Sequence, residues 1–184
     1  MKTGLLLVDI QNDYFPGGMV ELVGIDKAAA KAEELLTLFR KHQLPTYHIQ
    51  HLALEKGAPA FLANTKGSEI HERAKPFPED IVIQKHFPNS FRETDLLGKL
   101  RDSDVSKLVI CGAMSHMCID ATTRAAADYG FRCTVIHDAC ATRDLKFLDT
   151  VVPAQQVHAS FMSALAFAYA KVISLEEFLS SFRV

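Results

Sequence analysis

The chain has 184 residues, of which 48% are hydrophobic and 23% are charged, with 9 Gly and 7 Pro. This composition is typical of a globular protein and excludes a disordered, collagenous or low-complexity chain, and the length suits one domain over residues 1–184. Twenty Lys and Arg against 22 Asp and Glu give a net charge of -2, which argues against a nucleic-acid partner.

The apolar segments of the chain are short. Leu5–Ile10 and Ala164–Ala170 are the longest, and neither approaches the 18 or more residues of a membrane span. The N-terminal segment is also too short for a signal-peptide core, so we expect a cytoplasmic protein with no membrane partner. Four cysteines have spacings that match no zinc ribbon, zinc finger or CxxC pair, so we expect free thiols at Cys111, Cys118, Cys133 and Cys140.

Predicted strands alternate with predicted helices. Continuous aliphatic or β-branched runs predict buried strands at Gly4–Asp9, Thr46–His51, Ile81–Gln84, Lys107–Cys111, Arg132–His137 and Lys171–Ile173. Apolar spacing and capping residues predict helices at Ala28–Phe39 (capped by Asp26), from Leu96 (after Thr94), at Cys118–Tyr129, at Pro153–Ala170, and after a capping box of Ser174 and Glu177. This order predicts a three-layer α/β/α Rossmann-like fold with a central, mostly parallel six-stranded sheet.

Three chemically active residues fall at predicted strand ends, where parallel sheets bind their ligands. Asp9 and Lys85 close the first and third strands, and the loop 112–117 leads from the fourth strand to Cys118. The helix start and Lys85 favour a thiolate at Cys118, while Asp9 would accept and return a proton. Singly, Asp9 could be a turn cap, Lys85 a solvated side chain and Cys118 a core residue; their joint placement favours catalysis.

Three segments carry a more specific signal: LLVDIQNDYF at 6–15, KHFPNSF at 85–91 and CGAMSHMCIDATTRAA at 111–126. Together, in this order, they resemble the isochorismatase-like cysteine hydrolase superfamily, which includes nicotinamidases, N-carbamoylsarcosine amidohydrolases and isochorismatases. The resemblance covers residues 4 to about 175.

The resemblance implies a catalytic triad of Cys118 as nucleophile, Asp9 as general base and acid, and Lys85 as the cation that stabilises the thiolate. It also implies a non-proline cis peptide between Ala113 and Met114, and an oxyanion hole formed by the N–H groups of Met114 and Cys118. Isochorismatases of this superfamily lack the cysteine and cleave a vinyl ether. The presence of Cys118 therefore favours hydrolysis of a C–N bond in a small amide or carbamoyl substrate, through a thioester.

Nicotinamidases of the superfamily hold a metal ion with an Asp-x-His and a further His after the second strand. This chain instead reads HIQHLAL at 48–54, and two histidines three residues apart on a strand point to opposite faces. We therefore expect no metal and no other cofactor, and nicotinamide becomes a less favoured substrate. His48 is expected to be a plain hydrogen-bonded residue, and His51 to line the pocket.

Other residues in the same loops are candidates for substrate contact or support. Core packing is the ordinary alternative for aromatic residues, yet the resemblance places such residues around the pocket, which gives Phe15, Phe87 and Phe91. Met117, with His116 beside it, is a further candidate because it lies in the turn before Cys118. Gln11 and Asn89 are expected to orient Asp9 and Lys85 through hydrogen bonds.

The segment Leu52–Pro78 is long and rich in Gly and Pro, so it either covers the site or contacts a neighbouring subunit. Members of the superfamily commonly associate, and we expect a homodimer or larger homo-oligomer. Two alternatives to the hydrolase remain: a non-catalytic binding or regulatory member of the fold, and an isochorismatase-type hydrolase of another small molecule. An oxidant-sensing thiol is weakened because no resolving cysteine lies near Cys118 in the sequence.

Overall fold

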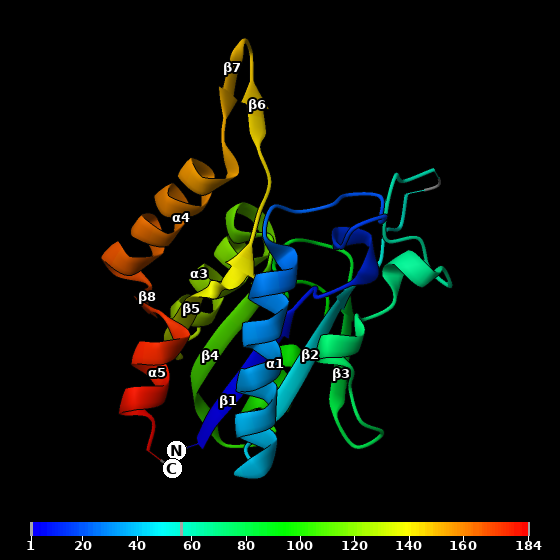
Figure 1. The fold of residues 1–184 in the computed structure, drawn as a ribbon. Helices are drawn as coiled ribbons and strands as arrows, with labels where there is room; N and C mark the ends of the chain where they lie inside the picture. Colours follow the sequence, from blue (N-terminus) through cyan, green and yellow to red (C-terminus); the bar gives the residue numbers. More distant parts are fainter. Residues whose placement is uncertain (1, 56, 184) are drawn as a thin grey trace.

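The computed structural model describes residues 2–55 and 57–183 and places one sheet between two layers of helices (Figure 1). The sheet has six strands, all parallel, in the order β3-β2-β1-β4-β5-β8. They are β1 (Lys2–Val8), β2 (Thr46–His51), β3 (Ile81–Lys85), β4 (Val105–Ala113), β5 (Arg132–Ala141) and β8 (Ala170–Ile173). The predicted α/β fold with a six-stranded sheet is confirmed.

Helices cover both faces of the sheet. The helices α1 (Ile25–Lys41) and α5 (Leu175–Ser181) pack on one face, and α2 (Leu96–Asp102), α3 (Asp120–Asp128) and α4 (Ala154–Ala168) pack on the other. Within β1, Leu5 and Leu7 belong to the first core, whereas Leu6 and Val8 belong to the second. Because both faces of the strand are buried, its sequence is continuously apolar.

The chain builds the sheet outward from its centre in two directions. It runs from β1 through β2 to β3 on one side and then returns to β4, β5 and β8 on the other. The order therefore reverses between the neighbouring strands β1 and β4, and the carboxyl ends of strands at such a reversal form the usual ligand crevice of an open α/β sheet.

Short elements occupy the connections. Three 3-10 turns span Asn12–Tyr14, Lys66–Ser68 and Glu72–Ala74, and a π-helical turn spans Ser115–Ile119. An antiparallel hairpin of β6 (Leu145–Phe147) and β7 (Thr150–Val152) projects from the body (Figure 1). No helix within 2–55 or 57–183 is long and apolar enough to cross a bilayer.

Several predicted boundaries change in the structure. Helix α1 begins at Ile25 after Gly24, whose φ of 74° serves the N-cap position, so Asp26 lies in the first turn and does not cap it. The π-helical turn precedes α3, which starts only at Asp120. The capping box of Ser174 and Glu177 is confirmed at the start of α5.

Candidate active site

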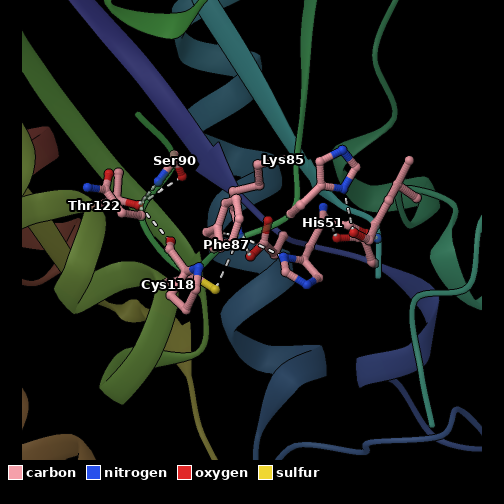
Figure 2. Close-up of polar contacts among 12 residues, drawn as sticks. His51, Lys85, Phe87, Ser90, Cys118 and Thr122 are labelled. Carbon is pink, nitrogen blue, oxygen red and sulfur yellow. Dashed lines mark hydrogen bonds and ion pairs between the residues drawn. The ribbon is translucent and has the colours of Figure 1, made fainter. Parts of the chain in front are cut away.

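The structure brings Asp9, Lys85 and Cys118 together at the carboxyl end of the sheet. Figure 2 shows Lys85 and its polar contact with Cys118. Asp9 follows β1 directly, Lys85 is the last residue of edge strand β3, and Cys118 lies in the π-helical turn after β4. Lys85 Nζ is 2.7 Å from Asp9 Oδ2 and 3.3 Å from Cys118 Sγ. Asp9 and Lys85 are wholly buried and Cys118 is 5% exposed, so the charges of the first two must balance each other.

Two further groups hold the Lys85 ammonium beside Asp9. Its ammonium donates to Phe87 O and to His51 Nδ1, each at 3.1 Å. Burial lowers the pKa of Lys85, but the neighbouring Asp9 and Cys118 outweigh burial and the pKa is raised overall. Lys85 therefore remains a cation at neutral pH.

The contact with Lys85 also fixes the proton on the His51 ring. An ammonium group only donates, so Nδ1 of His51 accepts and the ring proton sits on Nε2. Burial, and then the charge of Lys85, lower the pKa of His51, so its ring is neutral at pH 7. His51 is therefore a fixed hydrogen-bond donor in the wall of the site.

Cys118 differs from the sequence-based expectation in its ionisation. Its pKa is raised, first by burial and second by the Asp9 carboxylate, while Lys85 acts in the opposite direction. The direction of this pKa opposes the expected preformed thiolate, because the sequence does not reveal how deeply the sulfur is buried. The thiol needs a base when it reacts, and Asp9 is the neighbouring carboxylate.

The loop before Cys118 passes very close to β1. A Cβ atom at Gly112, whose φ is 124°, would lie only 1.9 Å from Val8 O, so this position requires glycine. The peptide bond between Ala113 and Met114 is cis, as the resemblance implied. Gly112 thus allows the loop that carries the cysteine to lie directly against the strand that carries Asp9.

A pocket of about 540 Å³ opens above Cys118. Its lining is mostly apolar and consists of Tyr14, His51, Ala53, Leu54, Glu55, Ala58, Phe61, His86, Phe87, Pro88, Met114, Met117 and Cys118. A cavity of this size suits a small molecule. Of the residues predicted to contact substrate, His51, Phe87 and Met117 line this pocket.

Phe15 and Phe91 do not line the pocket, and these two predictions are wrong. The Phe15 ring stacks on His71 with 3.5 Å between ring centroids. The Phe91 ring packs in the core against Tyr129 and Phe131. Sequence alone did not show on which side of the loops these rings lie.

The profile of the isochorismatase domain matches residues 3–177 of this chain. The chain belongs to the isochorismatase family. The uncharacterized isochorismatase family protein YddQ of Bacillus subtilis is 51% identical, with 97% of this chain and 99% of YddQ covered. The crystal structure of a putative isochorismatase hydrolase from Oleispira antarctica is 50% identical, with a TM-score of 0.94 over 98% of this chain and 97% of that one. A more distant relative, the maleamate amidohydrolase of Pseudomonas putida, is 26% identical over 77% of this chain and 73% of its own length.

The wall of this isochorismatase-family pocket includes Tyr14 and Phe61, which the sequence analysis missed. Phe61 has a φ of 60°, donates its N–H to Asp13 Oδ2 at 2.6 Å and accepts from Ala53 N at 2.9 Å. Its ring packs edge-on against Tyr14 and His51. Part of the segment 52–78 is therefore fixed against the site as a pocket wall, the first of the two predicted alternatives.

Gln11 and Asn89 do not orient the catalytic side chains as predicted. The Gln11 amide donates to His51 O and Ser68 O and accepts from His51 N, each at 2.8 Å. Asn89 Oδ1 accepts from Phe91 N at 2.9 Å, within its own turn. Gln11 thus supports the site indirectly, by fixing the end of the strand that carries His51.

His48 lies away from the pocket, with Nε2 3.3 Å from Asp80 Oδ2 in a buried setting. His48 and His51 thus do not share a site. Among residues 2–55 and 57–183 no group of three or more His, Cys, Asp or Glu is arranged to hold a metal ion.

Proposed function

We propose that this isochorismatase-family hydrolase is a cysteine amidohydrolase that cleaves the C–N bond of a small amide or carbamoyl compound. The observation that carries the proposal is the contact of one buried ammonium, Lys85 Nζ, with both Asp9 Oδ2 (2.7 Å) and Cys118 Sγ (3.3 Å) beneath the pocket. A base and a nucleophile that both contact one fixed positive charge are an arrangement suited to acyl transfer.

Acylation begins with proton transfer from Cys118 to Asp9. The sulfur then attacks the substrate carbonyl carbon, and the N–H groups of Met114 and Cys118, which the family resemblance assigns as the oxyanion hole, would bind the developing oxyanion. Protonated Asp9 returns the proton to the leaving nitrogen as the C–N bond breaks. The products of this half-reaction are ammonia or an amine and a thioester on Cys118.

Deacylation uses the same residues in the reverse order. Asp9 takes a proton from water, the hydroxide attacks the thioester carbonyl, and the C–S bond breaks to release the carboxylic acid. The departing Cys118 sulfur recovers the proton from Asp9. Lys85 stays protonated throughout, which agrees with its raised pKa, and stabilises each anion that forms beside it.

Two further facts support amide chemistry. The resemblance separates cysteine-containing amidohydrolases from isochorismatases, which lack the cysteine, and this chain has Cys118. One relative is a maleamate amidohydrolase by name, and this name supports the proposal of amide hydrolysis. The apolar walls of the pocket suit a substrate whose body is flat or uncharged.

The test is amine or ammonia release from a panel of small amides, ureas and carbamoyl compounds, with the wild type and Cys118→Ala. Cys133→Ala is the matched control because Cys133 is equally buried but lies in β5, outside the pocket. We expect turnover of at least one compound by the wild type and the control, and none by Cys118→Ala. Equal turnover by Cys118→Ala would refute the proposal.

A further inference from the structure

Two polar atoms in the pocket wall are left unused by the proposed mechanism. Tyr14 Oη and His51 Nε2 form no hydrogen bond with any residue in 2–55 or 57–183, and both residues line the pocket above Cys118. Tyr14 is only 2% exposed, yet neither atom is one of the unpartnered atoms that the described residues seal from solvent. Both atoms are therefore open to the pocket. Because buried polar groups normally have a partner, we expect a ligand to supply it.

Gln11 holds both of these wall residues. Its backbone carbonyl accepts from Tyr14 N at 3.0 Å, and its side-chain amide bonds to His51 N and His51 O, each at 2.8 Å. The Phe61 ring packs edge-on against both rings, 4.8 Å from Tyr14 and 5.5 Å from His51 between centroids. The two polar groups are thus fixed relative to each other before a substrate binds, which lowers the entropy cost of binding.

Both groups are neutral hydrogen-bond donors at neutral pH. Burial raises the pKa of Tyr14, and the charges of Cys118 and Asp9 raise it further, so the hydroxyl keeps its proton. His51 carries its proton on Nε2, because Nδ1 accepts from the Lys85 ammonium (Figure 2). Burial, followed by the charge of Lys85, lowers the pKa of His51 and keeps the ring neutral. The wall thus presents one O–H and one N–H group without a charge.

The other polar side chains of the lining are acceptors. His86 Nδ1 is 2.8 Å from Leu52 O, and a carbonyl oxygen only accepts, so the proton of the neutral His86 ring is on Nδ1 and Nε2 accepts. Glu55, when ionised, also only accepts. Among the described lining side chains that the mechanism does not use, Tyr14 and His51 are therefore the donors.

We propose that Tyr14 Oη and His51 Nε2 bind an oxygen acceptor in the body of the substrate, a second carbonyl or a carboxylate. This inference rests on the proposed amidohydrolase function, because it concerns which amides the site accepts. A ligand without such an acceptor would exclude water from both donors and leave them unpaired in a mostly apolar pocket. Tyr14 and His51 therefore select an amide with a second oxygen over a hydrocarbon amide of the same shape.

The test measures binding to Cys118→Ala by NMR titration with three matched series of primary amides. The first series carries a methyl ketone, with one, two or three methylene groups between the ketone and the amide. The second has a methylidene group in place of the ketone oxygen, and the third has a carboxylate in place of the methyl ketone. We expect the best ketone or carboxylate to bind about tenfold or more tightly than its hydrocarbon counterpart. The first and third series distinguish the two acceptors.

Two further substitutions in the Cys118→Ala background remove one donor each. Tyr14→Phe keeps the ring against Phe61, and His51→Asn keeps an oxygen acceptor on the side of Lys85. Each should remove most of the preference for the second oxygen while leaving hydrocarbon binding within about twofold. Tyr129→Phe is the matched control, because Tyr129 is half-exposed and lies outside the pocket, and it should keep the full preference. Thermal unfolding shows whether each variant is folded.

Equal binding of the three series to Cys118→Ala, or no binding of any of them, would overturn the inference. A preference that Tyr14→Phe and His51→Asn both retain would also overturn it. Hydrolysis of the same compounds by the chain with Cys118 is a separate readout. Selective binding without hydrolysis would count against the amidohydrolase alone, whereas hydrolysis without any preference would count against this inference alone.

Discussion

The floor and the wall of the pocket are built differently. The floor consists of Asp9, Lys85 and Cys118, all buried and placed by strand ends or the turn after a strand. The wall residues Ala53, Leu54, Glu55, Ala58 and Phe61 lie outside the named helices and strands, and Leu54 is 69% exposed. A buried, charged floor is suited to bond chemistry, and an exposed apolar wall is suited to substrate recognition. We therefore expect floor substitutions to lower kcat and wall substitutions to raise KM.

The largest effect is expected for Asp9→Asn, which keeps the shape of the side chain but removes both proton transfers. Turnover of a substrate that requires Cys118 should fall by about 10²–10⁴. The measurement is kcat at saturating substrate. Retention of more than about a tenth of wild-type turnover would show that Asp9 orients or caps without carrying protons.

The same variant should change thiol labelling in the opposite direction. The Asp9 carboxylate raises the pKa of Cys118, so its removal lowers that pKa and increases the thiolate fraction at a given pH. Iodoacetamide should therefore alkylate Cys118 faster in Asp9→Asn than in the wild type, although Asp9→Asn is the less active enzyme. In the wild type the labelling rate should keep rising with pH beyond the usual cysteine range. Slower alkylation of Cys118 in Asp9→Asn would contradict the conclusion that the Asp9 carboxylate raises the pKa of Cys118.

Lys85→Met tests whether the floor depends on charge balance. The substitution leaves the Asp9 carboxylate buried without its cation and should lower the free energy of unfolding by about 3–5 kcal/mol. The double variant Asp9→Asn/Lys85→Met removes both charges and should recover most of that loss while remaining inactive. Urea unfolding measures the free energy of unfolding of the single and the double variant. A double variant no more stable than Lys85→Met would argue against a stabilising ion pair between Asp9 and Lys85.

A smaller effect is expected in the wall. Phe61→Ala removes a ring that contacts Tyr14 and His51, and loss of one apolar contact with substrate should raise KM by about tenfold. Asp13→Asn, which disturbs the acceptor of the Phe61 N–H, should raise KM in the same direction. Steady-state kinetics on one substrate separate the effect on KM from the effect on kcat. A fall in kcat with unchanged KM would assign Phe61 to the floor.

The smallest effect is expected for Phe15→Leu. The Phe15 ring stacks on His71 outside the pocket, so kcat and KM should each stay within about twofold of the wild type. This variant is the aromatic control for Phe61→Ala. An equal rise of KM in both variants would mean that the loops, and not the wall specifically, determine substrate binding.

The floor could be predicted from the sequence because its residues follow continuous apolar strands. The alternation of strands and helices predicts a parallel sheet, in which the carboxyl ends of all strands lie at the same edge. Asp9, Lys85 and Cys118 are therefore expected near one another before any contact is known. The ionisation of Cys118 could not be predicted in the same way. Helix position and Lys85 are visible in the sequence, whereas the burial that raises the pKa depends on the complete fold.

The position of Phe61 in the wall could not be predicted because a long-range contact determines it. Phe61 is placed by Asp13, which is 48 residues away in the sequence, and no local pattern links the two. Tyr14 and Phe15 are adjacent, yet only Tyr14 lines the pocket. The strands β6 and β7 could not be predicted for a simpler reason. Each has three residues, which are too few for a periodic sequence pattern to indicate a strand.

The central claim is that an acyl group is carried on Cys118. The most direct measurement uses an activated ester that carries the acyl group of a confirmed amide substrate, so that acylation of the enzyme is faster than hydrolysis of the acyl-enzyme. The reaction is quenched with acid, and the masses of the intact protein and of its peptides are then measured. The account predicts a mass increase equal to that acyl group on the peptide containing Cys118, absent from Cys118→Ala and retained in Cys133→Ala. Ester turnover with an unmodified Cys118 peptide, undiminished in Cys118→Ala, would contradict it.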